Sequence, residues 1–389
     1  DAPRVKDLNE LPSAYLTGLF DPYMGLEGLC VILETNRGCP YGCTFCDWGS
    51  ATASKIRKFD IDRVMQEVEC TSRAQVGLVS IADANFGIFP RDVDIARRAA
   101  DLKKTTGLPS GFGGHYAPYT VAYLRDISDV LTEGDILTTG TLSLQTMDES
   151  TLDVINRANI KTEKYDALAV EMRRAGLPLT IELMMGLPGS TLDSFREDLQ
   201  QCIDRELPTR VNLTTLLVNS PMNAPEYVEK HEIKTWQPVS PGTQAMLCST
   251  SSYTEDDLAV MELLRTGYTL FENYGVLRII SRYVSQETSL TEMQFYERLL
   301  FDSKDHHAWP MLNLLCYFVS SHMAAPVSWS LVMDELARYL EQELALGDSA
   351  ARRSALAAQL ACLPSHGRGY PETVELECDV VAWHRDILA

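Results

Sequence analysis

The sequence predicts an α/β protein: a partial (β/α)6 TIM-like barrel with a mostly helical C-terminal extension. Apolar runs of strand length alternate with segments of helical period up to about residue 237, and beyond it the period is helical alone. A barrel takes roughly 200 to 250 residues, and the 389 residues of this chain leave room for such an extension. We expect a lead-in over residues 1–29, the barrel over 30–237 and the helical region over 238–389.

Six apolar runs are predicted to be the strands, and several are almost uninterrupted, as is typical of parallel strands buried on both faces. They are Cys30–Glu34, Gly77–Ala82, Ser110–His115, Ile136–Gln145, Pro178–Gly186 and Val211–Val218. Alternation with helices predicts right-handed crossovers between parallel neighbours. Functional groups are then expected after the carboxyl ends of the strands.

The expected helices are marked by their first and last residues. Asp60 can cap a helix that runs to Ala74, Pro90 begins one that ends near Gly107, and Thr191 opens one that ends near Arg205. A stretch rich in Pro, Gly and Ser over residues 238–243 marks a domain boundary. Helical periodicity then covers Asp256–Arg282, Glu292–Leu300, Trp309–Ser321, Ser328–Leu346 and Ala350–Leu363.

Composition excludes several classes of function. A formal net charge of −20 argues against a basic surface that binds nucleic acid. No run approaches the roughly 18 uninterrupted apolar residues of a membrane span, so we expect no membrane partner. Of the ten cysteines, three lie within eight residues and the others are scattered, which favours metal binding in a reducing compartment over disulfides. We therefore expect a cytoplasmic protein.

The strongest motif is the C-x3-C-x2-C spacing of Cys39, Cys43 and Cys46, which follows the first predicted strand. Three thiolates in a tight loop can hold three irons of a four-iron cluster and leave the fourth iron without a protein ligand. Structural zinc is one alternative, but it usually takes four ligands, and no second Cys pair or nearby His completes the set. Thiols without a metal are the other alternative.

These three cysteines, the aromatic Phe45 before the last of them and their position after strand one resemble the radical SAM superfamily. The resemblance implies a [4Fe-4S] cluster whose open iron binds S-adenosylmethionine (SAM). It also implies reductive cleavage of SAM to a 5′-deoxyadenosyl radical, which removes hydrogen from a substrate. An electron donor such as flavodoxin or ferredoxin would be the redox partner. The resemblance covers about residues 29–227.

Polar residues at strand ends extend the resemblance to a SAM site. Ser143 and Gln145 share one face of strand four, where the family contacts the ribose or carboxylate of SAM, and Arg157 would reach the carboxylate. Asp83 and Asn85 end strand two, where the family's Gly-Gly-Glu tripeptide is absent, and either would bind the SAM amino group. Ordinary hydrogen-bonded or turn-capping roles are the alternatives.

Residues 181–191 resemble the family's Gly-x-Pro-Gly-x-Thr element, whose backbone lies beside the adenosine. Period-two geometry puts Glu182 and Gly186 on one face, so Glu182 is expected to bind the ribose or amine of SAM, or else to form an ion pair in the barrel. Gly186 is alternatively a turn glycine. Leu216 and Val218 would wall off the adenine, or belong to the ordinary core.

His115 and Tyr116, after strand three, are expected to face the pocket above the cluster and to bind substrate or relay a proton. A structural role is the alternative for each.

The segments Leu11–Asp21 and Cys46–Gly49 look most like cobalamin-dependent members of the superfamily. This implies C-methylation of a peptide or other natural product, with cobalamin supplied by a domain that these 389 residues do not contain or by a partner. The alternative is cobalamin-free hydrogen transfer, such as peptide epimerisation, with a cysteine as hydrogen donor. Cys248 is one candidate donor, and the others are Cys70, Cys202, Cys316, Cys362 and Cys378.

Overall fold

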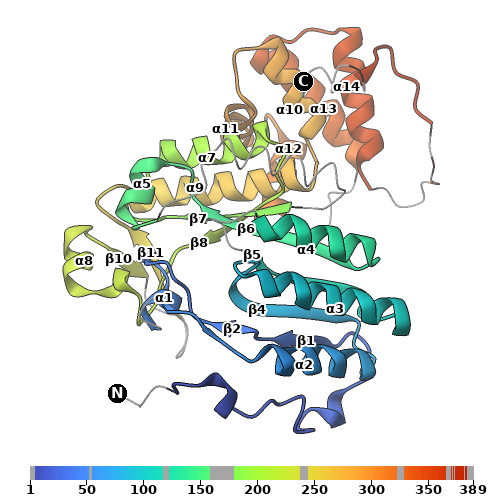
Figure 1. Ribbon diagram of the computed structural model, residues 1–389. Coiled ribbons are helices and arrows are strands. Elements are labelled where there is room, and N and C mark those ends of the chain that lie inside the picture. Colours follow the sequence, from blue (N-terminus) through green and yellow to red (C-terminus); the bar gives the residue numbers. More distant parts are fainter. Residues whose placement is uncertain are drawn as a thin grey trace. The chain divides into compact units, whose positions relative to one another are not determined.

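The computed structural model describes residues 5–51, 55–116, 122–157, 179–236, 244–321, 328–364, 369, 371, 373–380 and 382. The chain forms two compact units, and Figure 1 labels their elements. The first unit comprises the chain up to Ser190 together with Leu207–Thr254. The second comprises Thr191–Glu206 and the chain from Glu255 onward. The boundary proposed at 238–243 lies outside the described residues.

A six-stranded parallel sheet forms the centre of the first unit, in the order β1-β4-β5-β6-β7-β8. Spatial order follows chain order, so each crossover returns the chain to the neighbouring position, as in a barrel. This arrangement confirms the predicted partial barrel. The strands are β1 (Cys30–Leu33), β4 (Leu78–Phe86), β5 (Gly111–Tyr116), β6 (Leu137–Gln145), β7 (Leu179–Met185) and β8 (Thr209–Leu213).

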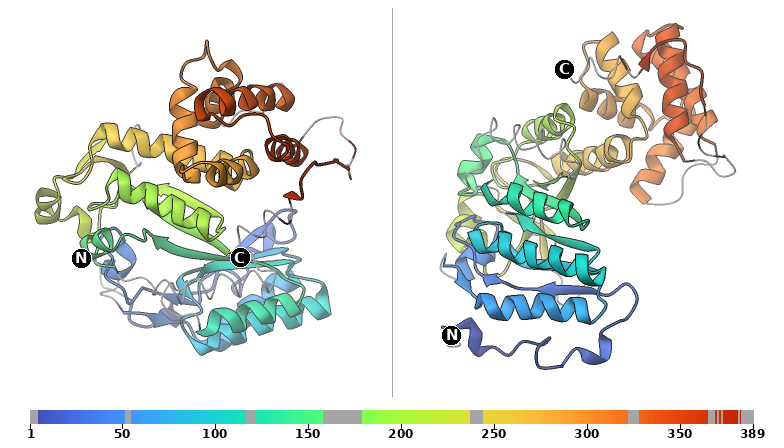
Figure 2. Two further views of the ribbon diagram at one scale, coloured as in Figure 1. Left: turned by 90° about the horizontal axis from the view of Figure 1, so that it is seen from above. Right: turned by 45° about the vertical axis from the view of Figure 1, so that its right-hand side comes forward.

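Three helices lie along one face of this sheet, as Figure 1 and the right-hand view of Figure 2 show. They are α2 (Ile61–Arg73), α3 (Pro90–Thr106) and α4 (Ala122–Glu133). Val79 and Ile81 of β4 are at most 1% exposed on this face, as are Ile95 of α3 and Ile127 of α4. Removal of this apolar surface from water stabilises the layered arrangement.

The opposite face of the sheet is much more accessible. Ile32, Leu78 and Leu137 alternate with the buried positions of β1, β4 and β6, and they are 61%, 47% and 73% exposed. This inner face extends to the carboxyl ends of the strands, where functional groups are expected.

Short elements complete the first unit. β2 (Asn36–Arg37) pairs with β3 (Arg57–Lys58), and β10 (Lys234–Trp236), β11 (Ala245–Ser249) and β9 (Thr215–Leu216) form an antiparallel sheet in that order. The short helices are α1 (Asp47–Ala51), α5 (Glu149–Val154) and α8 (Pro225–Lys230), and one-turn 3-10 helices cover Leu8–Glu10, Asp21–Tyr23 and Pro221–Asn223.

The expectation of one strand over Val211–Val218 is wrong. The chain leaves the parallel sheet after Leu213, and Thr214 then bonds both ways: its amide donates to the Met185 carbonyl (3.0 Å), and its carbonyl accepts from the Leu247 amide (3.1 Å). The apolar run is therefore divided between two sheets.

The second unit is helical in its described part. Its helices are α7 (Leu192–Asp204), α9 (Glu255–Tyr268), α10 (Arg278–Glu287), α11 (Glu292–Asp302), α12 (Pro310–Ser321), α13 (Trp329–Leu344) and α14 (Ala350–Cys362). The expectation of a single helix over Asp256–Arg282 is wrong. The helix α9 passes into a π-helical turn (Thr269–Asn273), the helical structure stops before Gly275, and α10 begins at Arg278. Gly275 has a φ of +72°, which glycine adopts at little cost.

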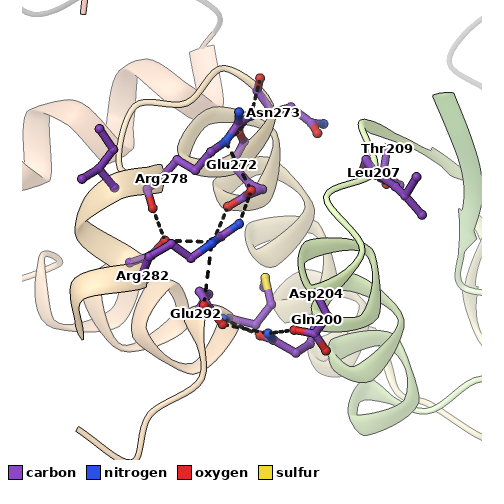
Figure 3. A network of polar contacts seen from close by, with 12 residues as sticks. Gln200, Asp204, Leu207, Thr209, Glu272, Asn273, Arg278, Arg282 and Glu292 are labelled. Atoms are coloured by element: carbon purple, nitrogen blue, oxygen red, sulfur yellow. Dashed lines mark hydrogen bonds and ion pairs between the residues drawn. The ribbon is translucent and has the colours of Figure 1, made fainter. Parts of the chain in front are cut away.

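A buried polar network joins helices of this second unit (Figure 3). Nη1 and Nη2 of Arg282 donate to the Glu272 carboxylate, at 3.0 and 2.8 Å, and the Tyr296 hydroxyl donates to the same carboxylate at 2.9 Å. Gln200 of α7 donates to Glu292 at 2.8 Å and accepts from the Met293 amide at 3.0 Å. The network pairs a buried cation with a buried carboxylate, which offsets the cost of removing both from water.

No helix in the described part of the chain is both long and apolar enough to cross a membrane.

Candidate active site

The cysteine loop leads from β2 into the short helix α1. Gly38 has a φ of +111°, a conformation that other residues rarely adopt. A Cβ atom at Gly49 would overlap the Tyr41 carbonyl oxygen, so only glycine lets α1 pack this closely against the loop. The loop thus depends on glycines at both of its ends.

Hydrogen bonds hold this loop from two sides. The Thr44 amide donates to the Ile155 carbonyl at 2.9 Å, and Asn156 Nδ2 donates to the Gly42 carbonyl at 2.9 Å. On the other side, the Met222 amide donates to the Thr44 carbonyl at 2.8 Å. The residues after α5 and the 3-10 helix Pro221–Asn223 therefore fix the loop against the barrel.

The cysteines share one cavity of about 220 Å³ with residues from the carboxyl ends of β4, β5 and β6. This is the position at which parallel barrels gather functional groups. The sequence-predicted residues in its lining are Cys39, Cys43, Phe45, Cys46, Asp83, Asn85, His115, Tyr116, Ser143, Gln145 and Arg157. Tyr41, Trp48 and Ala84 also line it.

The three cysteine thiols lie on the wall of this one cavity. Within the described ranges, no three Cys, His, Asp or Glu side chains are close enough together to hold one metal ion. The cavity wall thus offers the three thiols that a four-iron cluster with one open iron requires, and the assignment of Cys39, Cys43 and Cys46 as its ligands stays a prediction.

Each of the three thiols has a nearby N–H donor. Asn85 Nδ2 lies 3.2 Å from Cys39 Sγ, and Arg157 Nη1 lies 3.3 Å from Cys43 Sγ. Burial raises the pKa of the Cys46 thiol, and a hydrogen bond from the Trp48 backbone amide opposes that rise. In this structure Asn85 and Arg157 donate to sulfur, and their expected contact with SAM stays a prediction.

Asp83 binds the base of the cysteine loop. Its carboxylate accepts from the amides of Thr35 (2.7 Å) and Asn36 (3.1 Å), from Asn36 Nδ2 (2.6 Å) and from the Thr35 hydroxyl. Burial raises the pKa of Asp83 to about 6, and these hydrogen bonds oppose the rise. The sequence analysis missed Thr35 and Asn36, because no local pattern links them to a residue 47 or 48 positions away.

Strands β6 and β7 bring further predicted residues together. The Ser143 hydroxyl donates to the Glu182 carboxylate at 2.7 Å; Ser143 lines the cavity, and Glu182 is bonded to it but is not among the lining residues. Gln145 ends β6 with a φ of +71° and is 9% exposed. A left-handed backbone is unfavourable for glutamine, and such strain concentrates at functional sites.

His115 and Tyr116 occupy different surroundings at the end of β5. Tyr116 is 3% exposed and packs on Phe86, with 6.1 Å between ring centres. Burial raises the pKa of Tyr116 to about 12, so its hydroxyl keeps its proton at neutral pH. His115 is exposed, and it is therefore the more accessible of the two to a substrate.

The remaining predicted residues lie outside the cavity lining. Leu216 packs against an apolar cluster that the cavity residue Phe45 also contacts, and Gly186 has a φ of +78° at the end of β7. Val218 is 77% exposed. Cys248 is 3% exposed in β11 and is not brought to the cavity.

Comparison with known proteins identifies the class. Residues 33–202 match the model of the radical SAM superfamily, so the chain contains a radical SAM domain. Members of that superfamily use a [4Fe-4S] cluster and SAM, in agreement with the expected cofactors.

Two methyltransferases are similar in sequence to this chain. Over 319 residues the chain is 33% identical to the cobalamin-dependent radical SAM methyltransferase TokK of Streptomyces tokunonensis, with 77% of this chain and 46% of that protein covered. The same values apply to 2-(S-pantetheinyl)-carbapenam-3-carboxylate methyltransferase of Streptantibioticus cattleyicolor. The chain thus spans about half the length of these relatives. The similarity confirms the predicted resemblance to cobalamin-dependent members.

A solved structure is also similar. It is the radical SAM methyltransferase TsrM of Kitasatospora setae with cobalamin and a [4Fe-4S] cluster bound, at 15% identity and a TM-score of 0.47. The match covers 55% of this chain and 40% of that one.

Proposed function

We propose that this chain is the radical SAM part of a cobalamin-dependent methyltransferase that acts on an unactivated carbon of a natural product, either a small molecule or a peptide. The observation that carries the proposal is the meeting of three cysteine thiols with polar strand-end residues in one cavity. Identity to the two methyltransferases supports the choice of reaction. Flavodoxin or ferredoxin would supply the electron in the cytoplasm.

Roles follow from the chemistry of the side chains. The cluster, held by the three cysteines, would supply the electron that cleaves SAM to the 5′-deoxyadenosyl radical. The Glu182 carboxylate accepts from Ser143 and has capacity left for a ribose hydroxyl or the SAM amine. Gln145 presents an amide to the cavity. The Tyr116 hydroxyl stays protonated and would orient the substrate as a hydrogen-bond donor, and His115 is accessible to the substrate.

Cobalamin would come from a domain outside this chain. Large apolar side chains of the first unit support such a neighbour: Leu19 is 66% exposed, Tyr23 and Leu26 are each 58% exposed, and Trp48 is 41% exposed. A contiguous exposed apolar patch marks an interaction surface, and three of these four side chains lie within eight residues of the lead-in. We place the cobalamin domain against the lead-in residues and the outer side of Trp48.

Cobalamin-free epimerisation is the second proposal, and the geometry supports it less. A cysteine that returns hydrogen must reach the substrate radical. Cys248 is buried in β11 and is absent from the cavity lining. Methylation needs no such thiol.

Mass spectrometry in deuterated water tests the choice. The full-length protein, reconstituted anaerobically with iron, sulfide and cobalamin, is given SAM, reductant and 2-(S-pantetheinyl)-carbapenam-3-carboxylate as the first probe. Substrates of peptide type follow. Methylation adds one methylene unit to the product, whereas return from a thiol adds one deuterium, because S–H exchanges with solvent. A product with deuterium and no added methyl group would contradict methylation, and absence of 5′-deoxyadenosine would contradict both reactions.

A further inference from the structure

We infer that Asn85 and Arg157 raise the reduction potential of the cluster by donating N–H groups to two of its three thiolates. The inference rests on the proposed function, because it requires the cluster at these cysteines. It assigns both residues a role that differs from contact with SAM.

The pattern of donors is regular. Asn85 from the end of β4 approaches Cys39 at 3.2 Å, Arg157 from beyond α5 approaches Cys43 at 3.3 Å, and the backbone amide of Trp48 approaches Cys46. Each sulfur therefore has a donor, and the three donors come from different parts of the fold. Only the first two can be removed by changing a side chain.

Asn85 is held in place and kept from water. It is 4% exposed, and Asp83, two residues earlier, fixes the same strand to the base of the cysteine loop. The β4–β5 register is irregular between Ile81 and Phe86, which accounts for cavity contacts by consecutive residues of β4. A hydrogen bond in such a dry setting is electrostatically stronger than one in water.

Arg157 is fixed by its own contacts. Its amide donates to the Leu152 carbonyl at 2.9 Å, and its guanidinium also donates to the Ser143 carbonyl and lies 6.0 Å from the centre of the Phe45 ring. Cys43, its sulfur partner, is 7% exposed. The positive charge therefore stays near the sulfur without rearrangement.

The sign of the effect follows from charge. Reduction adds one electron to the cluster, and hydrogen bonds to the sulfurs and a nearby cation stabilise the added negative charge. Removal of either donor should make the potential more negative. A tenfold loss in the ratio of reduced to oxidised cluster at fixed ambient potential corresponds to about 59 mV for a one-electron couple.

The test is a redox titration of the reconstituted full-length protein, followed by electron paramagnetic resonance without SAM or substrate. Asn85→Leu removes one donor, Arg157→Met removes donor and charge, and Arg157→Lys keeps the charge. We expect at least a threefold loss of reduced cluster at fixed potential for Asn85→Leu, a larger loss for Arg157→Met, and an intermediate one for Arg157→Lys.

Asn156→Gly is the matched control. It removes an asparagine that donates to the Gly42 carbonyl of the same loop rather than to sulfur, and glycine suits its φ of +51°. Its potential should equal that of the unmodified protein. If Asn85→Leu and Arg157→Met also leave the potential unchanged, the inference is wrong.

If a variant fails to bind the cluster, a measurement on the unmodified protein still tests the inference. Resonance Raman spectra in light and heavy water should show a shift of the iron–thiolate stretching bands, because the N–H donors exchange with solvent. Bands that do not move would also overturn the inference. Failure of the unmodified protein to bind any cluster would instead overturn the proposed function.

Discussion

Ser143 and Glu182 are direct partners in the register between β6 and β7, and the serine hydroxyl donates to the carboxylate at 2.7 Å. A pair so linked acts on a ligand as one unit, so its effects on SAM binding should not add.

We expect Ser143→Ala and Glu182→Ala each to weaken SAM affinity about fivefold, since one lost hydrogen bond is worth on the order of 1 kcal/mol. The double variant should lose much less than the product of the two effects. Calorimetric titration of the reconstituted protein with SAM measures this. Ser110→Ala, whose hydroxyl donates to the Gly77 carbonyl at the amino end of β5, is the control and should bind normally. Unchanged affinity in all the variants would contradict the site.

The left-handed backbone of Gln145 predicts a gain in stability together with a loss of binding. Gln145→Gly should raise stability by about 1 kcal/mol, because glycine relieves the steric cost, while SAM affinity falls. Gln75 is an exposed glutamine with a φ of +60° outside the cavity, so Gln75→Gly should give the same gain and leave affinity intact. Thermal unfolding measures the change in stability, and titration with SAM measures the change in affinity. An equal loss of affinity in both variants would remove the special role of Gln145.

Asp83 should make stability depend on pH. Its pKa is about 6 in the folded chain against an ordinary value of 3.8, so the folded state binds the proton more tightly. The contribution of this group is therefore fully present below about pH 4 and is lost as pH rises through about 6, by on the order of 3 kcal/mol. Urea unfolding of the apoprotein between pH 4 and pH 7 should show this loss, and Asp83→Asn should lack it. Parallel curves for both proteins would contradict the assignment.

The network of Figure 3 should make Arg282 important for the second unit. Arg282→Met leaves the Glu272 carboxylate, 6% exposed, without its main partner, and should cost about 3 to 5 kcal/mol. Arg265→Met removes a partly exposed pair with Glu262 in α9 and should cost less than about 1 kcal/mol. Urea unfolding followed by circular dichroism compares them. Similar costs would show that the buried pair is dispensable.

The cluster itself gives the simplest prediction. Replacement of Cys39, Cys43 and Cys46 by alanine should abolish bound iron and sulfide after anaerobic reconstitution. Cys30→Ala, which changes an exposed cysteine outside the cavity lining, should retain a full cluster. Iron and sulfide analysis that finds an intact cluster in the triple variant would contradict the assignment.

Local patterns were enough to predict the barrel and the residues around its cavity. The strands are apolar runs, and each strand end is visible in the chain, so Ser143 and Asn85 could be found without coordinates. The contact partner of each polar side chain could not be predicted from such patterns. Whether Asp83 meets SAM or Thr35, and whether Arg157 meets a carboxylate or Cys43, depends on contacts across 48 and 114 residues. The break at Gly275 was missed because a glycine inside a helical pattern is often tolerated.

One strand carries two attachments to the cysteine loop. Asp83 holds the base of the loop, and Asn85 reaches its first cysteine, with a single residue between them. An insertion or deletion in that interval would turn one of the two side chains to the opposite side of the strand. We therefore expect the spacing between Asp83 and Asn85 to be kept in related sequences. The two residues should occur together, and insertions or deletions should fall in the surrounding turns.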